Sequence, residues 1–109
     1  KKHAGEWEFP GGKLEKGENP AQALKRELAE ELALDVLVLD EMYRLSTVSD
    51  NGNELVLHFL RALKKPGSEP SACENQQFCW LELDRLDGVK WLKPDLEFVE
   101  FISRKRVNK

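Results

Sequence analysis

The sequence is short of the features that mark several protein classes. It has no apolar run of about 18 or more residues, which a membrane-spanning helix needs. Its first residues, KKHAGEWEF, do not contain the apolar stretch of a signal peptide. Its two cysteines, Cys73 and Cys79, are too few for a disulfide framework and lack the spacing of a zinc site. These absences predict a soluble, cytoplasmic protein with reduced thiols and no membrane partner.

Basic residues are not in excess either. The chain has 17 lysines and arginines against 20 aspartates and glutamates, which gives a net charge of −3. Such a chain lacks the positive footprint with which proteins grip long nucleic acids. If its ligand is a polyanion, cations must mediate the contact. The length of 109 residues and the 40% of hydrophobic residues fit one globular domain, 1–109, with a core of its own.

Hydrophobic spacing and turn residues predict a mixture of strands and helices. Asn51-Gly52 favours a tight hairpin turn between two apolar segments. The first expected strand has almost no chain before it with which to pair, so we expect an N-terminal segment to be missing. Strands are expected at 6–9, 36–48, 54–62 and 77–83, and a last helix opens at Pro94 with Leu96, Val99 and Ile102 at helical spacing. This order indicates an α/β or α+β domain with a mixed sheet.

The strongest local signal is a helix over residues 20–32. Asn19 is a good N-cap, and Pro20 suits the first helical position. Gln22, three residues after Asn19, completes a pattern similar to a capping box. The helix is therefore expected to begin at Pro20 and to end near Leu32.

Three glutamates share one side of this helix. At about 100° per residue, Glu27, Glu30 and Glu31 span an arc of about 100°. Like charges three or four residues apart destabilise a helix by roughly 0.2–0.5 kcal/mol. Divalent cations would reverse this effect, because carboxylates and other oxygens are the ligands of Mg²⁺ and Mn²⁺. The alternative is a solvated charged face that Lys25 and Arg26 partly balance. The neighbouring arc of about 80° is expected to pack and contains Ala21, Leu24, Leu28 and Leu32.

A longer pattern surrounds these acids. The signature of the Nudix hydrolase family is a glycine, a glutamate and then R-E-U-x-E-E-x-G-U, where U is aliphatic. The chain resembles it from Gly12 through Glu18 to the run RELAEELAL at 26–34. The one departure is Ala33, where the family has glycine. Because glycine suits a left-handed helix end, alanine there is expected to cost about 1 kcal/mol or to shift the end of the helix.

The resemblance implies an α/β/α sandwich in which a loop, the helix and a second loop hold divalent cations against a nucleoside diphosphate group. In this reading, metal-binding carboxylates are Glu27, Glu30 and Glu31, and the carbonyl of Gly11 or Gly12 is a further ligand. Arg26 orients the acids, and Glu18 supports the site as a second acid. Mg²⁺ or Mn²⁺ would position the phosphate and activate a water, and one carboxylate would act as general base. The resemblance leaves open which carboxylate that is.

Residues outside the signature resemble the MutT-like branch of the family. EFPGGK is typical of that branch, and its Phe9 would line the base pocket or else be a core residue. Glu74 resembles a further metal ligand or catalytic base, or is a solvated loop residue. Asp95 in WLKPDLEF resembles the residue that reads the base edge, or else caps the last helix. His58, on a strand, is expected to be a satisfied wall residue, and Trp91 an aromatic at the pocket edge.

The resemblance implies Mg²⁺-dependent hydrolysis of a nucleoside triphosphate to the monophosphate and pyrophosphate. Nucleotide-pool sanitising, with 8-oxo-dGTP or CTP-type nucleotides as substrates, is the expected role. One alternative is a hydrolase of ADP-ribose or dinucleoside polyphosphates, although residues 48–52, VSDNG, lack the proline or tyrosine of those branches. Another is a non-catalytic domain that recognises a damaged base in a DNA repair glycosylase, but such domains usually lose the glutamates that are present here.

Overall fold

The structure is a computed structural model, and it describes residues 2–3, 5–49, 51–71 and 77–107. It comprises two compact units, one of Lys1–Phe9 with Gln76–Lys109 and one of Pro10–Asn75. Each unit combines strands with a helix, which confirms the predicted mixed α and β class. In the described part of the chain, the strands form two antiparallel pairs, and one isolated parallel bridge adds to them.

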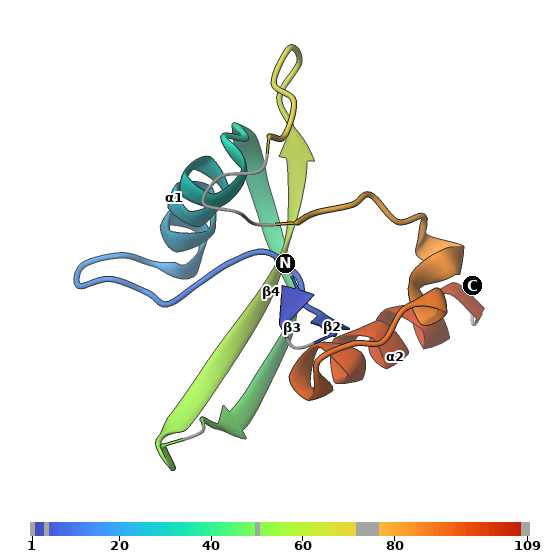
Figure 1. The fold of residues 1–109 in the computed structure, drawn as a ribbon. Helices are drawn as coiled ribbons and strands as arrows, with labels where there is room; N and C mark the ends of the chain where they lie inside the picture. The colour runs from blue at the N-terminus through green and yellow to red at the C-terminus, as the bar shows by residue number, and fades with distance from the viewer. Residues whose placement is uncertain (1, 4, 50, 72–76, 108–109) are drawn as a thin grey trace. The chain divides into compact units, whose positions relative to one another are not determined.

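The unit of residues 10–75 is built on a long twisted hairpin (Figure 1). Strand β3, Val36–Val48, pairs antiparallel with β4, Glu54–Lys64, from Val36 opposite Lys64 to Val48 opposite Glu54. At the turn, the Ser49 amide donates to the Asn53 carbonyl at 2.8 Å. The predicted first strand is confirmed to the residue, and the second runs two residues beyond its predicted end at Ala62.

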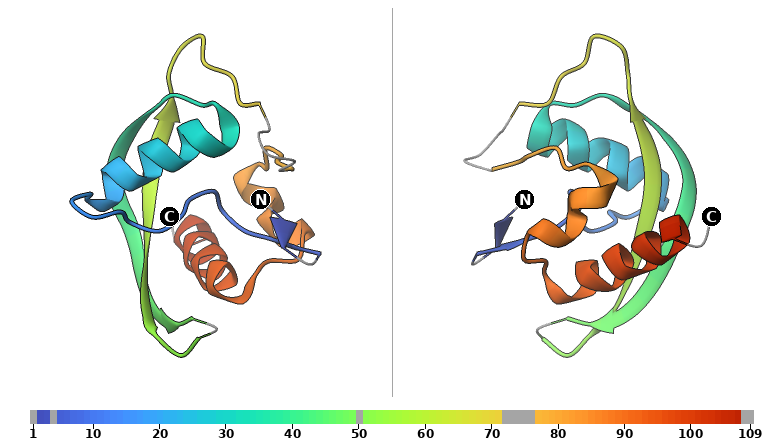
Figure 2. Two further views of the ribbon diagram at one scale, coloured as in Figure 1. Left: turned by 60° about the vertical axis from the view of Figure 1, so that its left-hand side comes forward. Right: turned by 90° about the vertical axis from the view of Figure 1, so that its right-hand side faces the viewer.

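Helix α1, Pro20–Leu32, lies near the end of the hairpin that is distant from the turn (Figure 2). The Asn19 side chain accepts from the Gln22 amide at 2.8 Å, and the Gln22 side chain accepts from the Asn19 amide at 2.9 Å. This confirms the capping box and the beginning of the helix. The core of this unit consists of Ala23, Leu28, Leu32, Leu34 and Val36, all at most 9% exposed.

Helix α1 ends in a left-handed residue, although the sequence has alanine at this position, where the family has glycine. Ala33 has φ 51° and ψ 35°, which is the left-handed region, and among the described residues it alone has a positive φ without being glycine. Its amide donates to the Ala29 carbonyl at 3.0 Å, and the Leu34 amide donates to the Leu28 carbonyl at 3.2 Å. The helix therefore stops where glycine would stop it, and alanine bears the conformational cost.

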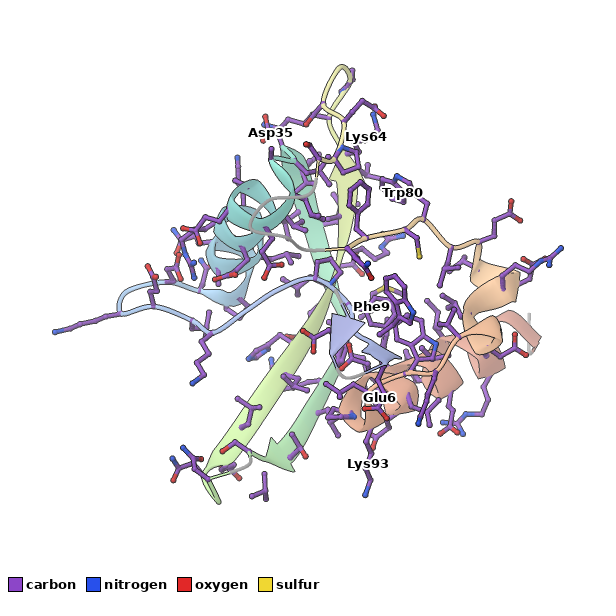
Figure 3. All side chains as sticks on the ribbon, in the orientation of Figure 1. Glu6, Phe9, Asp35, Lys64, Trp80 and Lys93 are labelled. Carbon is purple, nitrogen blue, oxygen red and sulfur yellow. The ribbon has the colours of Figure 1, made fainter. Side chains whose placement is uncertain are left out.

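The segment after β4 returns to the C-terminal end of α1. The Ser71 amide donates to the Leu32 carbonyl at 2.7 Å, and the Asp35 amide donates to the Ser68 hydroxyl at 2.8 Å. The Lys65 amide donates to the Asp35 carbonyl at 3.0 Å. Figure 3 shows Asp35 and Lys64 at the same end of the hairpin. Backbone groups that a helix end leaves unpaired are thus satisfied by this loop.

The other unit contains short strands and the last helix. Strands β1, Lys2–His3, and β2, Glu6–Trp7, pair antiparallel, so the predicted strand at 6–9 is shorter than expected. Trp7 also forms a parallel bridge with Trp91, in which its amide donates to the Lys90 carbonyl at 2.8 Å. Helix α2, Lys93–Val107, begins one residue before the predicted Pro94.

The predicted strand at 77–83 is wrong. Residues 77–82 form no ladder with any strand in the described ranges, and a 3-10 helix, η1, follows at Leu83–Gly88. Leu86 in η1 is 6% exposed, and the Trp91 indole N–H donates to its carbonyl at 2.6 Å. The alternation of apolar residues in QFCWLEL therefore does not mark a pleated face, since Trp80 is 69% exposed.

No helix in the described ranges is long and apolar enough to cross a membrane.

Candidate active site

The acidic side of α1 is organised around one guanidinium. Arg26 contacts Glu18 with two parallel bonds, from Nε to Oε2 at 2.7 Å and from Nη2 to Oε1 at 3.0 Å. Its Nη1 donates to Glu27 at 2.6 Å and to Glu30 at 3.2 Å. Its Nη2 also donates to the Lys13 carbonyl at 3.0 Å. Bonds to Glu18 and Glu27 raise the pKa of Arg26, so this side chain stays charged in any buffer.

Glu18 is held on both of its carboxylate oxygens. Besides Arg26, the Glu15 amide donates to Glu18 Oε1 at 2.8 Å, and the Glu18 amide returns a bond to the Glu15 carbonyl at 3.0 Å. The bond with Arg26 and then the bond with the Glu15 amide lower the pKa of Glu18. Glu18 therefore ties the glycine loop to the helix through Arg26.

Glu27 lies against the backbone of the glycine loop. A Cβ atom at Gly12 would be 2.5 Å from Glu27 Cδ and 2.6 Å from its Oε2, which is closer than atoms can approach. Any side chain at position 12 must displace the carboxylate. The Glu27 side chain is only 17% exposed, and Ala23, one turn before it on the same side of α1, is 4% exposed. The acidic side of α1 is thus partly covered. At Glu27, the alternative prediction of a solvated charged face is wrong.

The donor set fits a divalent cation in its chemistry. Glu27, Glu30 and Glu31 lie within one arc of α1, and the Gly12 backbone is beside the first of them. Carboxylate and carbonyl oxygens are the ligands that Mg²⁺ and Mn²⁺ prefer. Among the described residues, however, no three acids or histidines already converge as a metal cluster. Arg26 bonds to Oε1 of both Glu27 and Glu30, and each carboxylate has a second oxygen that could bind a cation while the bond to Arg26 persists.

Phe9 and Asp95 come together in the other unit. The Phe9 amide donates to Asp95 Oδ2 at 2.7 Å, and Asp95 is 8% exposed. The Phe9 ring stacks on Trp91 with ring centroids 4.7 Å apart and meets Phe98 edge-on at 5.3 Å. Burial raises the pKa of Asp95 to about 6, the Phe9 bond opposes this effect, and the charge of Glu8 adds to it.

Both residues also had a structural interpretation. For Phe9, the core interpretation agrees with its packing against Trp91 and Phe98. For Asp95, the helix cap is wrong, because α2 begins at Lys93 and the Asp95 carboxylate bonds to Phe9 instead. The base-recognition role predicted for both residues is a matter for experiment.

Of two further predicted residues, the structure describes one. Glu74 falls outside the described residues. His58 is satisfied, as expected, because its Nδ1 bonds with the Glu41 carboxylate at 2.5 Å. That bond and then one with Arg44 lower the pKa of Glu41.

Sequence reasoning missed two members of the Arg26 network. Lys13 contributes a backbone carbonyl, which no side-chain pattern can signal. Glu15 contributes an amide to Glu18 and a carboxylate 3.6 Å from Arg26 Nε. The signal available for Glu15 was its spacing of three residues from Glu18, which suits a tight turn of the loop.

Comparison with known proteins identifies the family of this chain. The NUDIX domain model matches residues 1–100 of the chain. The 8-oxo-dGTP diphosphatase of Haemophilus influenzae is 38% identical over 81 residues, which cover 74% of this chain and 58% of that protein. The CTP pyrophosphohydrolase of Escherichia coli is 57% identical over 35 residues, which cover 32% of this chain and 26% of that protein.

The fold is also similar to a solved one. The solution structure of the E. coli ORF135 protein matches with a TM-score of 0.79 and 28% identity, and the match covers 100% of this chain and 76% of that chain. The family model extends over nearly the whole chain, and the relatives are named for cleavage of nucleoside triphosphates. The chain therefore belongs to the Nudix hydrolase family, in its MutT-like branch of pyrophosphohydrolases.

Proposed function

We propose that this chain, as one Nudix domain, hydrolyses a nucleoside triphosphate to the monophosphate and pyrophosphate, with Mg²⁺ or Mn²⁺ as cofactor. An oxidised purine nucleotide such as 8-oxo-dGTP is the first substrate to test, and CTP and dCTP are the second. The Haemophilus and Escherichia relatives support these two classes by their names. The observation that carries the proposal is the close approach of the Glu27 carboxylate to Gly12, where a Cβ would lie 2.5 Å from Glu27 Cδ, because it brings the acidic helix up against the glycine loop.

The chain's own residues have separate tasks in this proposal. Glu27, Glu30 and Glu31, with a carbonyl of the glycine loop, would hold the cation, as Nudix enzymes generally use a divalent metal. When bound, such a cation supplies neutralisation of phosphate oxygens and a more acidic water. Arg26 keeps Glu27 and Glu30 on the same side of α1 through its Nη1.

The reaction balances with water alone. A water oxygen bonds to phosphorus as the anhydride bond between the α- and β-phosphates breaks. The proton of the water passes to one of the three carboxylates, and pyrophosphate leaves. No oxidant, reductant or second substrate is required.

The test is a nucleotide panel with product identification. Wild type, Glu27→Gln, Glu30→Gln and Glu31→Gln are assayed for pyrophosphate and phosphate release with Mg²⁺ and with a chelator. Glu97→Gln, on an exposed position of α2, is the matched control. We expect pyrophosphate as product and a loss of at least tenfold in rate for the Glu27 variant. Turnover that is unchanged in all three variants would refute the proposal. Cleavage of ADP-ribose alone would support the alternative hydrolase.

A further inference from the structure

Asp95 is an unusual residue in its unit. In the ranges that the structure describes, no other polar or charged residue is as little exposed, at 8%. Carboxylates are rarely buried without a partner, because removing a charge from water is costly. One oxygen, Oδ2, accepts the Phe9 amide at 2.7 Å. No buried side-chain oxygen of the described residues lacks a hydrogen-bond partner.

The bond of Asp95 completes a set of contacts that hold one short segment. Trp7 is bonded on both of its backbone groups, from its amide to the Lys90 carbonyl and from the Leu92 amide to its carbonyl, each at 2.8 Å. Two residues later, the Phe9 amide is bonded to Asp95. Trp7 and Phe9 are thus bonded at every second residue, as in a parallel strand, but the acceptor for the Phe9 amide is a side-chain carboxylate and not a backbone carbonyl.

The ring of Phe9 is fixed by the same elements. It stacks on Trp91 with an interplanar angle of 16° and meets Phe98 at 79°. Trp91 precedes α2 and Phe98 is in it, so the ring and the amide of Phe9 are held by the same end of the same unit. In Figure 3, Phe9 lies on the segment that follows β2. Phe9 therefore has little freedom to move while Asp95 accepts its amide.

We propose that Asp95 is a positioning residue, whose carboxylate fixes the backbone of Phe9 and thereby the start of the Pro10-Gly11-Gly12 loop. In the chain, Gly11 is two residues from Phe9 and Gly12 is three, so a shift at Phe9 is transmitted to the loop by short covalent reach. The consequence for metal use rests on the function proposed for the acids of α1. This role is compatible with a contact of Asp95 with the base, since the Phe9 amide uses only one of about four acceptor sites of the carboxylate.

Two variants that share the branching of the aspartate side chain test whether Asp95 holds Phe9. Asp95→Asn keeps an oxygen that can accept the Phe9 amide, whereas Asp95→Leu keeps the branching and the number of side-chain heavy atoms and removes the acceptor. Asp87→Asn and Asp87→Leu, at an exposed position of η1, are the matched controls. Amide hydrogen exchange is measured by NMR for Phe9 and for Trp7, whose own bond to Lys90 serves as internal reference.

We expect Phe9 in Asp95→Leu to exchange about 10- to 100-fold faster relative to Trp7 than in the wild type, which is the range for loss of one charged hydrogen bond. Asp95→Asn should recover most of this protection, and the Asp87 variants should change nothing. Equal protection of Phe9 in the wild type and Asp95→Leu would overturn the proposal. So would equal loss of protection in Asp95→Asn and Asp95→Leu.

The functional arm is the Mg²⁺ concentration at half-maximal hydrolysis. It should rise several-fold in Asp95→Leu and stay near the wild-type value in Asp95→Asn, whatever each variant does to base preference. A role in base recognition alone predicts no change in metal response, and that result would overturn the catalytic part of the proposal. If the wild type hydrolysed no nucleotide, the proposed function would fail, whereas exchange at Phe9 would still decide whether Asp95 holds that segment.

Discussion

Ala33→Gly should stabilise the protein. At φ 51° and ψ 35°, Ala33 has the left-handed conformation, which costs an L-residue about 1–2 kcal/mol. Glycine removes that cost but loses more conformational entropy on folding, by roughly 0.5–1 kcal/mol. The side chain of Ala33 is exposed, so the substitution removes little packing. The net expectation is a gain of about 0.5–1 kcal/mol in the free energy of unfolding.

A gain of this size corresponds to a rise of about 2–6 °C in Tm for a domain of this length. It can be measured by urea unfolding and by thermal unfolding, both followed by circular dichroism. Ala29→Gly is the matched control, because Ala29 is also exposed on α1 but has helical geometry. That variant should lose about 1 kcal/mol. The same substitution should therefore have opposite signs at two positions four residues apart.

The reasoning fails if Ala33→Gly destabilises the protein as much as Ala29→Gly does. Such a result would mean that the backbone at position 33 leaves the left-handed region in solution. In Ala33→Gly, slow exchange of the amide at position 33 would show that its bond to the Ala29 carbonyl is retained and that the entropy cost of glycine explains the loss of stability. Fast exchange would show that the end of the helix has changed.

Three further predictions concern the acids and their partners. Gly12→Ala should fold normally but lose at least tenfold in Mg²⁺-dependent rate, because its Cβ would meet Glu27 at 2.5 Å; full activity would show that the carboxylate can move aside freely. Arg26→Lys should lose the two-pronged bond to Glu18 and lower the midpoint of urea unfolding, and an unchanged midpoint would contradict the network. Burial raises the pKa of Asp95 to about 6 in the folded state, against 3.8 for a free carboxyl group, so the wild type becomes less stable as the pH rises and the carboxylate ionises. The stability of Asp95→Asn relative to the wild type should therefore increase by about 1 kcal/mol between pH 5 and pH 8. Parallel pH dependence of the two proteins would refute that last prediction.

Features set by neighbours in the chain could be predicted from the sequence. The capping box of Asn19 and Gln22, and the hairpin turn at Asn51-Gly52, depend on residues within four positions of each other. Their geometry is local, so the residue types alone determine it. The acidic arc of α1 follows in the same way from helical periodicity, and its position beside Gly12 was expected from the family pattern.

Features that depend on distant partners could not be predicted in this way. The partner of the Asp95 carboxylate is an amide 86 residues away, and no spacing rule connects them. Residues 77–82 have the alternation of a strand, but a strand also needs a neighbour with free backbone groups. Burial of Ala23 on the acidic side is a third case, because periodicity places it within the acidic arc and outside the neighbouring arc of the leucines.

The guanidinium of Arg26 has a consequence for the order in which the enzyme folds and acquires its cation. The three carboxylates that it bonds carry three negative charges, and its own positive charge leaves two of them unbalanced. An internal counter-ion of this kind relieves enough repulsion for the helix to form without metal. Cation binding and folding are therefore separable events in this protein, and a chelator should stop turnover while the Tm of the protein changes little.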